Sequence, residues 1–272
     1  MDVKPVRVAA IASGKGGVGK TSFSINLAEA LSRAGNRVLL MDADFNLANV
    51  HLMLGQTPEQ TIADVMAGRC SIADTFLPGP AEVKVVPGVR GGGDLAGIDG
   101  SSLLSLIQSV DDIAGEVDIL LLDTAGGLRE RDMRLVAAAS DVMVLVTPDK
   151  VTIADTADYI RTLRLQYGVQ HFNVVTNMVR SQREGSQLIQ ALQSQIGFDH
   201  DLVIRHAGTL PYDPAVRKAS DRAMTLFQTS PDSKVCRGMR SIADGMNQQS
   251  RVYYPRGGMT FFFENQVLAG GC

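Results

Sequence analysis

Short apolar runs alternate along the chain with longer segments in which apolar residues recur at helical spacing. Six apolar runs predict buried strands, at residues 6–12, 38–41, 83–86, 119–122, 142–146 and 172–176. Six helical segments lie between or after them, at residues 21–34, 61–67, 101–112, 133–139, 153–167 and 186–195. The strand runs are almost continuously apolar, which is typical of strands covered by helices on both faces. The pattern therefore predicts an α/β fold with a doubly wound, mostly parallel sheet.

Length and composition are consistent with one large domain and a short tail. The chain has 272 residues, and its composition changes near residue 251, so we expect a domain at 1–250 and a C-terminal tail at 251–272. The net charge of -3 gives no sign of a chain that coats nucleic acid, and no direct nucleic-acid contact is expected. Three scattered cysteines, no secretory signal and no long apolar run indicate a cytoplasmic protein.

A glycine-rich stretch follows the first predicted strand and opens the first predicted helix. Glycines let the backbone curl so that several N–H groups point at one anion, and the helix N-terminus adds the positive end of its dipole. Lys20 is expected to reach the β- and γ-phosphates of ATP, and the Thr21 hydroxyl to bind Mg²⁺. The predicted nucleotide-binding residues of this stretch are Gly14, Lys15, Gly16, Gly17, Val18, Gly19, Lys20, Thr21 and Ser22.

The same stretch has two other interpretations. It also matches the G-x-G-x-x-G pattern of dinucleotide-binding folds, with Asp42 near the position of a ribose-binding acid. It could also be a glycine-rich turn without a ligand. The pair Lys20 and Thr21 has no role in a dinucleotide loop, whereas an NTPase needs both residues. The strand at 119–122 also ends at an acid, Asp123, which is the usual partner of Mg²⁺ in NTPases. The ATP interpretation is therefore favoured.

Lys15, directly after the first glycine, makes this loop similar to the deviant Walker A motif of the MinD/ParA ATPases. The resemblance extends to segments 41–44, 123–127 and 210–213 and covers about residues 6–229. It implies a single P-loop NTPase domain of the MinD type. It also implies an ATP-dependent homodimer in which two subunits face each other across their nucleotides.

The resemblance assigns roles by motif position. Lys15 would reach into the partner's site, and Asp44 would orient the attacking water, so the catalytic candidates are Lys15, Lys20 and Asp44. Asp42 would help to hold the hydration shell of Mg²⁺, and Asp123 would be the Walker B acid, so the metal candidates are Thr21, Asp42 and Asp123. Asp44 could instead cap the following helix, because Asp is a favoured N-cap residue.

Two later segments resemble the part of the family's site that holds the base. Asn177 ends a predicted strand and resembles the asparagine that contacts adenine, although it could also be a turn residue. Pro211, Tyr212 and Asp213 are expected to lie near the base.

A more detailed resemblance is to the flagellar-number regulators of the FlhG/FleN type. It rests on segments 42–55, 61–70, 211–219 and 255–264. In such proteins the ATP-bound dimer restrains a flagellar transcriptional activator and works with a signal-recognition-type GTPase at the cell pole. The resemblance implies an Mg²⁺-dependent ATPase that controls flagellar number or placement. Such an ATPase is cytoplasmic, with transient peripheral contact with the inner face of the cell membrane.

Other functions stay open within this group. A ParA-type DNA-partition ATPase needs a basic DNA-contacting surface, but the basic residues between Arg217 and Arg240 are interspersed with acidic ones, which is typical of a solvated face. A MinD-type division-site ATPase and a nucleotide-binding scaffold with negligible hydrolysis are the further alternatives. No cysteine lies near 123–127, so the nitrogenase iron protein is excluded.

The sequence also predicts two features of the protein surface. Arg161, Arg164 and Tyr167 have near-helical spacing and could form part of a docking surface for a partner, or a plain solvated face. In the tail, four apolar residues would share one face of a helix that binds membrane or packs into a groove of the protein itself. These four residues are Met259, Phe262, Phe263 and Val267.

Overall fold

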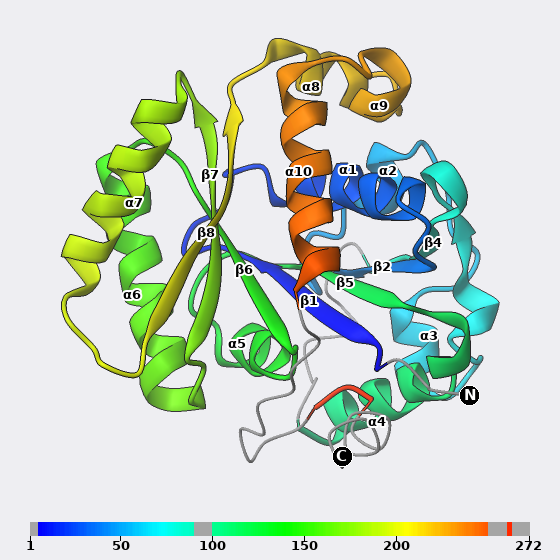
Figure 1. Ribbon diagram of the computed structural model, residues 1–272. Helices are drawn as coiled ribbons and strands as arrows, with labels where there is room; N and C mark the ends of the chain where they lie inside the picture. Colours follow the sequence, from blue (N-terminus) through cyan, green and yellow to red (C-terminus); the bar gives the residue numbers. More distant parts are fainter. Residues whose placement is uncertain (1–4, 90–99, 250–259, 263–272) are drawn as a thin grey trace.

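An eight-stranded sheet forms the centre of the molecule (Figure 1). The computed structural model describes residues 5–89, 100–249 and 260–262. The strand order is β3-β4-β2-β5-β1-β6-β7-β8, and all neighbours are parallel except β3 and β4. The strands are β1 Arg7–Ala12, β2 Val38–Ala43, β3 Leu77–Pro78, β4 Lys84–Val86, β5 Ile119–Thr124, β6 Asp141–Val146, β7 His171–Val179 and β8 Val203–Pro211.

Helices cover both faces of this sheet (Figure 1). The helices are α1 Lys20–Arg33, α2 Val50–Met53, α3 Ile62–Met66, α4 Gly100–Asp111, α5 Glu130–Ala137, α6 Lys150–Tyr167, α7 Gln182–Ile196, α8 Pro214–Ser220, α9 Leu226–Thr229 and α10 Lys234–Gln248. Short 3-10 turns lie at Ala73–Thr75, Pro80–Glu82 and Ala114–Glu116. Helices α1 and α10 pack on one face together with α2 and α9, and α3 to α7 pack on the other.

The two layers follow from the alternation of side chains along each strand. In β1, Ala9 and Ile11 point to the α1 and α10 layer, whereas Val8 and Ala10 point to the α6 layer. Every residue of β1, β2 and β5 is buried, as expected for central strands of a parallel sheet with helices on both sides. The predicted α/β fold with a doubly wound, mostly parallel sheet is confirmed.

All six predicted strands and all six predicted helices are present, and the sequence prediction missed other elements. The edge strand β8 has exposed residues in its first half, so its sequence lacks a continuous apolar run. Helix α10 has a buried stripe that includes Val235, Met239, Ile242 and Met246, but charged residues between them interrupt the apolar pattern. Helices α2, α8 and α9 and strand β3 are short, which leaves little periodicity to detect.

The arginines of α6 have a structural role. Arg161 Nε donates to the carbonyl oxygen of Ile196 at 3.3 Å, and the same side chain also donates to the carbonyl oxygen of Gln195. Arg164 forms ion pairs with Asp199 at 3.3 Å and Asp201 at 3.0 Å. These contacts tie α6 to the end of α7 and to the following loop. We therefore assign both guanidinium groups to intramolecular packing instead of the docking surface predicted from the sequence.

Part of the C-terminal tail lies in the core. Phe261 and Phe262 are buried, and the Phe262 N–H donates to Asp111 Oδ1 at the end of α4 at 2.6 Å. Phe262 has a φ of 54°, so the predicted helical face does not run through this position. Met259, Phe263 and Val267 lie outside the described residues. Within the described ranges, no helix has both the length and the apolar character that crossing a membrane requires.

Candidate functional site

The glycine-rich loop connects β1 to α1, as predicted. Gly17 and Gly19 have φ values of 82° and 89°, in the left-handed region that favours glycine. Gly14 lies against α6, since a Cβ added there would be 2.2 Å from the carbonyl oxygen of Asp155. The loop is therefore held in a tight curve at the start of α1, where backbone N–H groups can surround an anion.

The two lysines of the loop have different environments. Lys20 Nζ donates to Ser13 Oγ at 2.9 Å, inside the curve of the loop. Burial lowers the pKa of Lys20, while the carboxylates of Asp123 and Asp44 act in the opposite direction. Lys15 is exposed. Lys20 thus lies inside the loop, whereas the side chain of Lys15 is open to solvent and its charge acts on Asp149 at the start of α6.

Two buried carboxylates lie side by side below the loop. Asp42 on β2 and Asp123 on β5 are register partners in the sheet. Ser24 Oγ donates to Asp123 Oδ1 at 2.8 Å, and the hydroxyl of Thr21 also interacts with this carboxylate. Burial raises the pKa of both acids, and the charge of Asp123 raises the pKa of Asp42 further. A divalent cation would balance these charges, and oxygen ligands of this kind are those that Mg²⁺ prefers.

Asp42 also positions the segment that follows β2. Its Oδ2 accepts the backbone N–H groups of Asn49 at 2.8 Å and of Val50 at 2.9 Å, at the start of α2. Asp44 Oδ1 accepts the backbone N–H groups of Asn46 at 3.1 Å and Leu47 at 3.0 Å. Asp44 therefore closes a turn ahead of α2, a role similar to that of an N-cap residue. Its charge also acts on Lys20 and raises the pKa of that lysine.

The segment that follows β5 packs directly on the glycine-rich loop. A Cβ added to Gly126 would lie 2.9 Å from the carbonyl carbon of Lys15. The Gly127 N–H donates to the carbonyl oxygen of Ser13 at 3.2 Å. The segment after β5 therefore packs on the loop. The segment after β2 lies beside it, since the Arg131 guanidinium lies 5.0 Å from the centre of the Phe45 ring and the charge of Asp44 acts on Lys20.

A cavity of about 370 Å³ opens beside the loop. Its lining includes Asn177 and residues 211–213, which were predicted to lie near the base, together with Gly19 and Ser22 of the loop. Asn177 Nδ2 donates to the carbonyl oxygen of Val18 at 2.8 Å, which links the end of β7 to the loop. Asp213 also caps α8, since its Oδ1 accepts the Ala215 N–H at 2.9 Å. The structure thus brings Asn177, Pro211, Tyr212 and Asp213 to one pocket.

Several lining residues of this cavity were not predicted from the sequence. They come from α1, α2, α8 and α10 and include Phe23, Asn26, Met53, Arg217, Val235 and Met239. The sequence gives little indication that these residues line a cavity, because apolar side chains at helical spacing predict packing and do not indicate a ligand. Recognising α10 as a helix would have placed Val235 and Met239 on one buried face.

Comparison with known proteins identifies this arrangement. The family model for the CobQ/CobB/MinD/ParA nucleotide binding domain matches residues 9–226. The chain belongs to this family. It is 37% identical over 263 residues to the antiactivator FleN of Pseudomonas aeruginosa, covering 97% of this chain and 94% of FleN. The resemblance predicted from the loop and the later motifs is confirmed.

Solved MinD structures share the fold of this MinD/ParA protein. MinD in the MinC:MinD cell division complex of Aquifex aeolicus superimposes with a TM-score of 0.74 at 23% identity, covering 90% of this chain and 97% of that one. Pyrococcus horikoshii MinD complexed with Mg-ADP gives a TM-score of 0.71 at 23% identity, covering 89% of this chain and 96% of that one. The predicted MinD-like P-loop domain is therefore confirmed.

Proposed function

We propose that this MinD/ParA protein is an Mg²⁺-dependent ATPase whose ATP-driven dimerisation regulates flagellar number or placement. The observation that carries the proposal is the packing of the segment after β5 on the glycine-rich loop, with the Asp44 charge of the segment after β2 acting on Lys20, beside a cavity of about 370 Å³. A γ-phosphate in the loop would be close to both segments, so ATP and ADP would order them differently. The similarity to FleN supports the flagellar part of the proposal.

ATP would bind along the loop and extend into the cavity. The backbone of 14–19 and Lys20 would hold the phosphates, and Asn177 with Pro211, Tyr212 and Asp213 would surround the base. Thr21, Asp42 and Asp123 would hold Mg²⁺, since their oxygens lie together below the loop. Bound Mg²⁺ supplies positive charge that neutralises the phosphate oxygens.

Hydrolysis would need positioned charge and water more than covalent chemistry. Lys15 is exposed at the mouth of the loop, so it would reach the nucleotide of the partner subunit. Asp44 lies after β2, close enough to influence Lys20, and would orient the attacking water. In related NTPases a cation supplied by a partner accelerates hydrolysis by about 10³–10⁵-fold.

The ATP-bound dimer would restrain a flagellar transcriptional activator and act with a signal-recognition-type GTPase at the cell pole. The protein would be cytoplasmic, with transient contact with the inner face of the membrane. A DNA-partition ATPase, a division-site ATPase and a scaffold with negligible hydrolysis are the alternatives, and duplex DNA that stimulates turnover would favour the first of them.

The direct test is complementation in the source bacterium after deletion of the gene. We expect the wild-type protein to restore flagellar number, counted by electron microscopy, and Lys20→Ala to fail, because ATP would not bind. Arg69→Ala, on an exposed surface away from the loop, serves as the control and should complement. Normal flagellar number in the deletion strain, or full complementation by Lys20→Ala, would contradict the proposal.

A further inference from the structure

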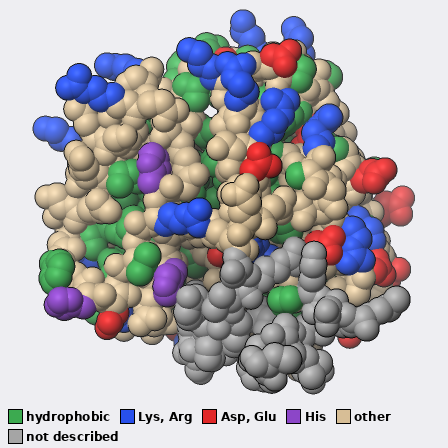
Figure 2. Space-filling model, in the orientation of Figure 1, with side chains coloured by type: hydrophobic (Ala, Val, Ile, Leu, Met, Phe, Trp, Pro, Cys, Tyr) green, Lys and Arg blue, Asp and Glu red, His purple; other side chains and the backbone are tan. Residues whose placement is uncertain are grey.

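Exposed basic side chains gather on one face of the molecule, here called the basic face. The start of α7, the helix α8 and the first half of α10 form it, and Figure 2 shows many Lys and Arg side chains along this upper rim. All eight of its basic residues are exposed: Arg180, Arg183, Arg217, Lys218, Arg222, Lys234, Arg237 and Arg240. In the sequence they are interspersed with acidic residues, which favoured a plain solvated face, but the fold brings them together.

The charge of this face differs from that of the remaining surface. Segments 180–184 and 211–240 hold eight basic and four acidic residues, whereas the whole chain has 26 basic and 29 acidic residues. The rest of the chain therefore has 18 basic and 25 acidic residues. Within the described part of the chain, Arg217 is the one residue of the eight whose side chain forms an ion pair, with Asp221 at 4.0 Å, while the backbone N–H of Arg180 donates to Glu184 Oε2. The face thus keeps a positive excess on a negatively charged protein.

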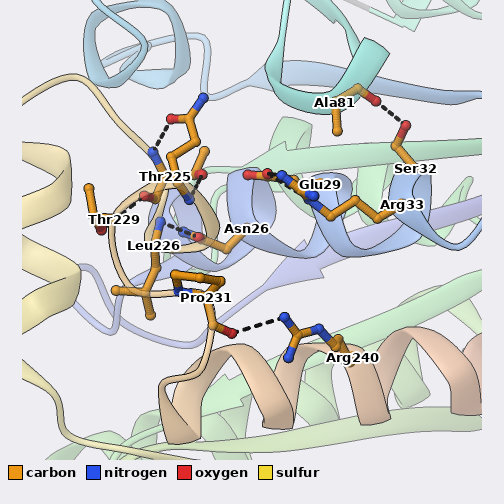
Figure 3. A network of polar contacts seen from close by, with 11 residues as sticks. Asn26, Glu29, Ser32, Arg33, Ala81, Thr225, Leu226, Thr229, Pro231 and Arg240 are labelled. Carbon is orange, nitrogen blue, oxygen red and sulfur yellow. Dashed lines mark hydrogen bonds and ion pairs between the residues drawn. The ribbon is translucent and has the colours of Figure 1, made fainter.

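Several of these side chains are held in place by the protein. Arg237 donates to the carbonyl oxygen of Asp232, and Arg240 Nη2 donates to that of Pro231 at 2.9 Å (Figure 3). The Arg240 guanidinium also stacks over the Phe227 ring at 5.2 Å. Arg180, Lys234 and Arg237 line one cavity of about 390 Å³ between the starts of α7 and α10. Such fixed cations lose little conformational freedom when a partner binds.

The basic face also adjoins the candidate nucleotide site. Arg217 lines the cavity beside the glycine-rich loop. The Leu226 N–H donates to Asn26 Oδ1 at 2.9 Å, and Asn26 on α1 lines the same cavity (Figure 3). A Cβ added to Gly55, just after α2, would lie 2.8 Å from Ala223 Cβ in the α8–α9 turn. A partner on this face would therefore contact elements that pack around the nucleotide.

The kinds of side chain on the face indicate the class of partner. Six of the eight cations are arginine, and Met224 is exposed in the adjoining α8–α9 turn, with an exposed fraction of 39%. Arg, Tyr and Met are enriched at protein interfaces, where Lys is depleted. The phosphates of a nucleic-acid backbone are neutralised by Lys and Arg alike, so the excess of arginine together with an exposed methionine favours a protein partner.

We propose that the basic face docks an acidic segment of a protein partner. Carboxylates of the segment would pair with the arginines, whose planar groups bind carboxylates through two hydrogen bonds. An apolar side chain of the segment would cover the exposed Met224. The proposal rests on the charge and composition of this face and does not depend on ATP hydrolysis or dimerisation.

The test is a fluorescence-anisotropy titration without nucleotide. The probe is a labelled synthetic peptide in which Glu and Asp alternate with Leu and Phe. The variant Arg180→Glu plus Arg237→Glu reverses two charges on the face, and Arg69→Glu plus Lys84→Glu makes the same change of net charge elsewhere on the exposed surface. We expect wild type and the control to bind equally, with an affinity that falls as salt rises. The face variant should bind at least about tenfold more weakly, because like-charge repulsion replaces attraction.

Three results would overturn the proposal. The first is no binding of the peptide to the wild-type protein. The second is an equal loss in the control and in the face variant when both melt like wild type. The third is binding of duplex DNA or of phosphatidylserine vesicles through the same arginines in place of the peptide, which would assign the face to nucleic acid or to membrane. Each result is independent of ATPase activity, so a failed dimerisation assay would leave this test intact.

Discussion

Single residues at the glycine-rich loop are held in states that are unfavourable without a ligand. Asp42 and Asp123 are buried as neighbours, and Lys20 is half-buried in the curve above them. Burial favours the neutral form of each group: it lowers the pKa of Lys20 and raises the pKa values of Asp42 and Asp123. Their types and order could be predicted from the sequence, since loop and strand-end motifs are local. Their burial and the resulting pKa shifts could not, because they depend on the pairing of β2 with β5.

Asp123→Asn tests the energetic cost of this burial. Burial raises the pKa of Asp123 from 3.8 to about 6, so ionisation of the folded protein costs stability above that pH. The cost disappears as the pH falls toward the unfolded-state pKa. The amide keeps an oxygen acceptor for Ser24. We therefore expect Asp123→Asn to raise the Tm of the nucleotide-free protein at pH 8, with a gain that shrinks toward pH 5.

The control for this measurement is Asp221→Asn, which changes an exposed carboxylate and should leave the Tm unchanged at both pH values. Calorimetry should also show weaker Mg²⁺-dependent ATP binding by Asp123→Asn. An unchanged or lower Tm at pH 8 in the absence of nucleotide would mean that the ionised Asp123 does not destabilise the fold.

At the scale of elements, sequence patterning predicted those parts of the fold that are buried on both sides. The strands β1, β5 and β6 lie within a residue or two of the expected positions because their apolar runs are continuous. The edge strand β8 and the amphipathic helix α10 were missed, because each has a solvated side that interrupts the apolar pattern. The position of the tail could not be predicted for another reason. Phe261 and Phe262 join the core through contacts with α4, which is distant in the sequence, and local periodicity carries no information on such contacts.

Phe261→Ala measures how firmly the tail is attached. Phe261 is fully buried in the same core as α4 and α6, so its truncation should lower the free energy of unfolding by about 3–5 kcal/mol. Urea unfolding followed by circular dichroism gives this value. Phe198→Ala is the matched control, because Phe198 is 87% exposed and its loss should change stability by no more than about 0.5 kcal/mol. Equal effects of the two substitutions would mean that the tail adds nothing to the core.

At the scale of the whole molecule, the nucleotide site and the basic face share the same helices. Helix α1 begins at the glycine-rich loop, and its Asn26 accepts a hydrogen bond from Leu226 of α9. The neighbouring Phe227 ring contacts the guanidinium groups of Arg33 and Arg240. Helix α10 lines the nucleotide cavity with one side and carries basic residues on the other. The loop was predictable from consecutive residues, whereas the cavity and the basic face combine residues from distant parts of the chain. Only the fold could bring them together.

The central claim is that ATP converts a monomer into a dimer, and light scattering coupled to size exclusion tests it most directly. With ADP and Mg²⁺ we expect the monomer mass. With ATP we expect wild type to shift toward twice that mass. Asp44→Ala should accumulate fully as dimer, because the attacking water is no longer oriented while the loop still binds ATP. A mass that is the same with ADP and ATP, in both wild type and Asp44→Ala, would contradict the account.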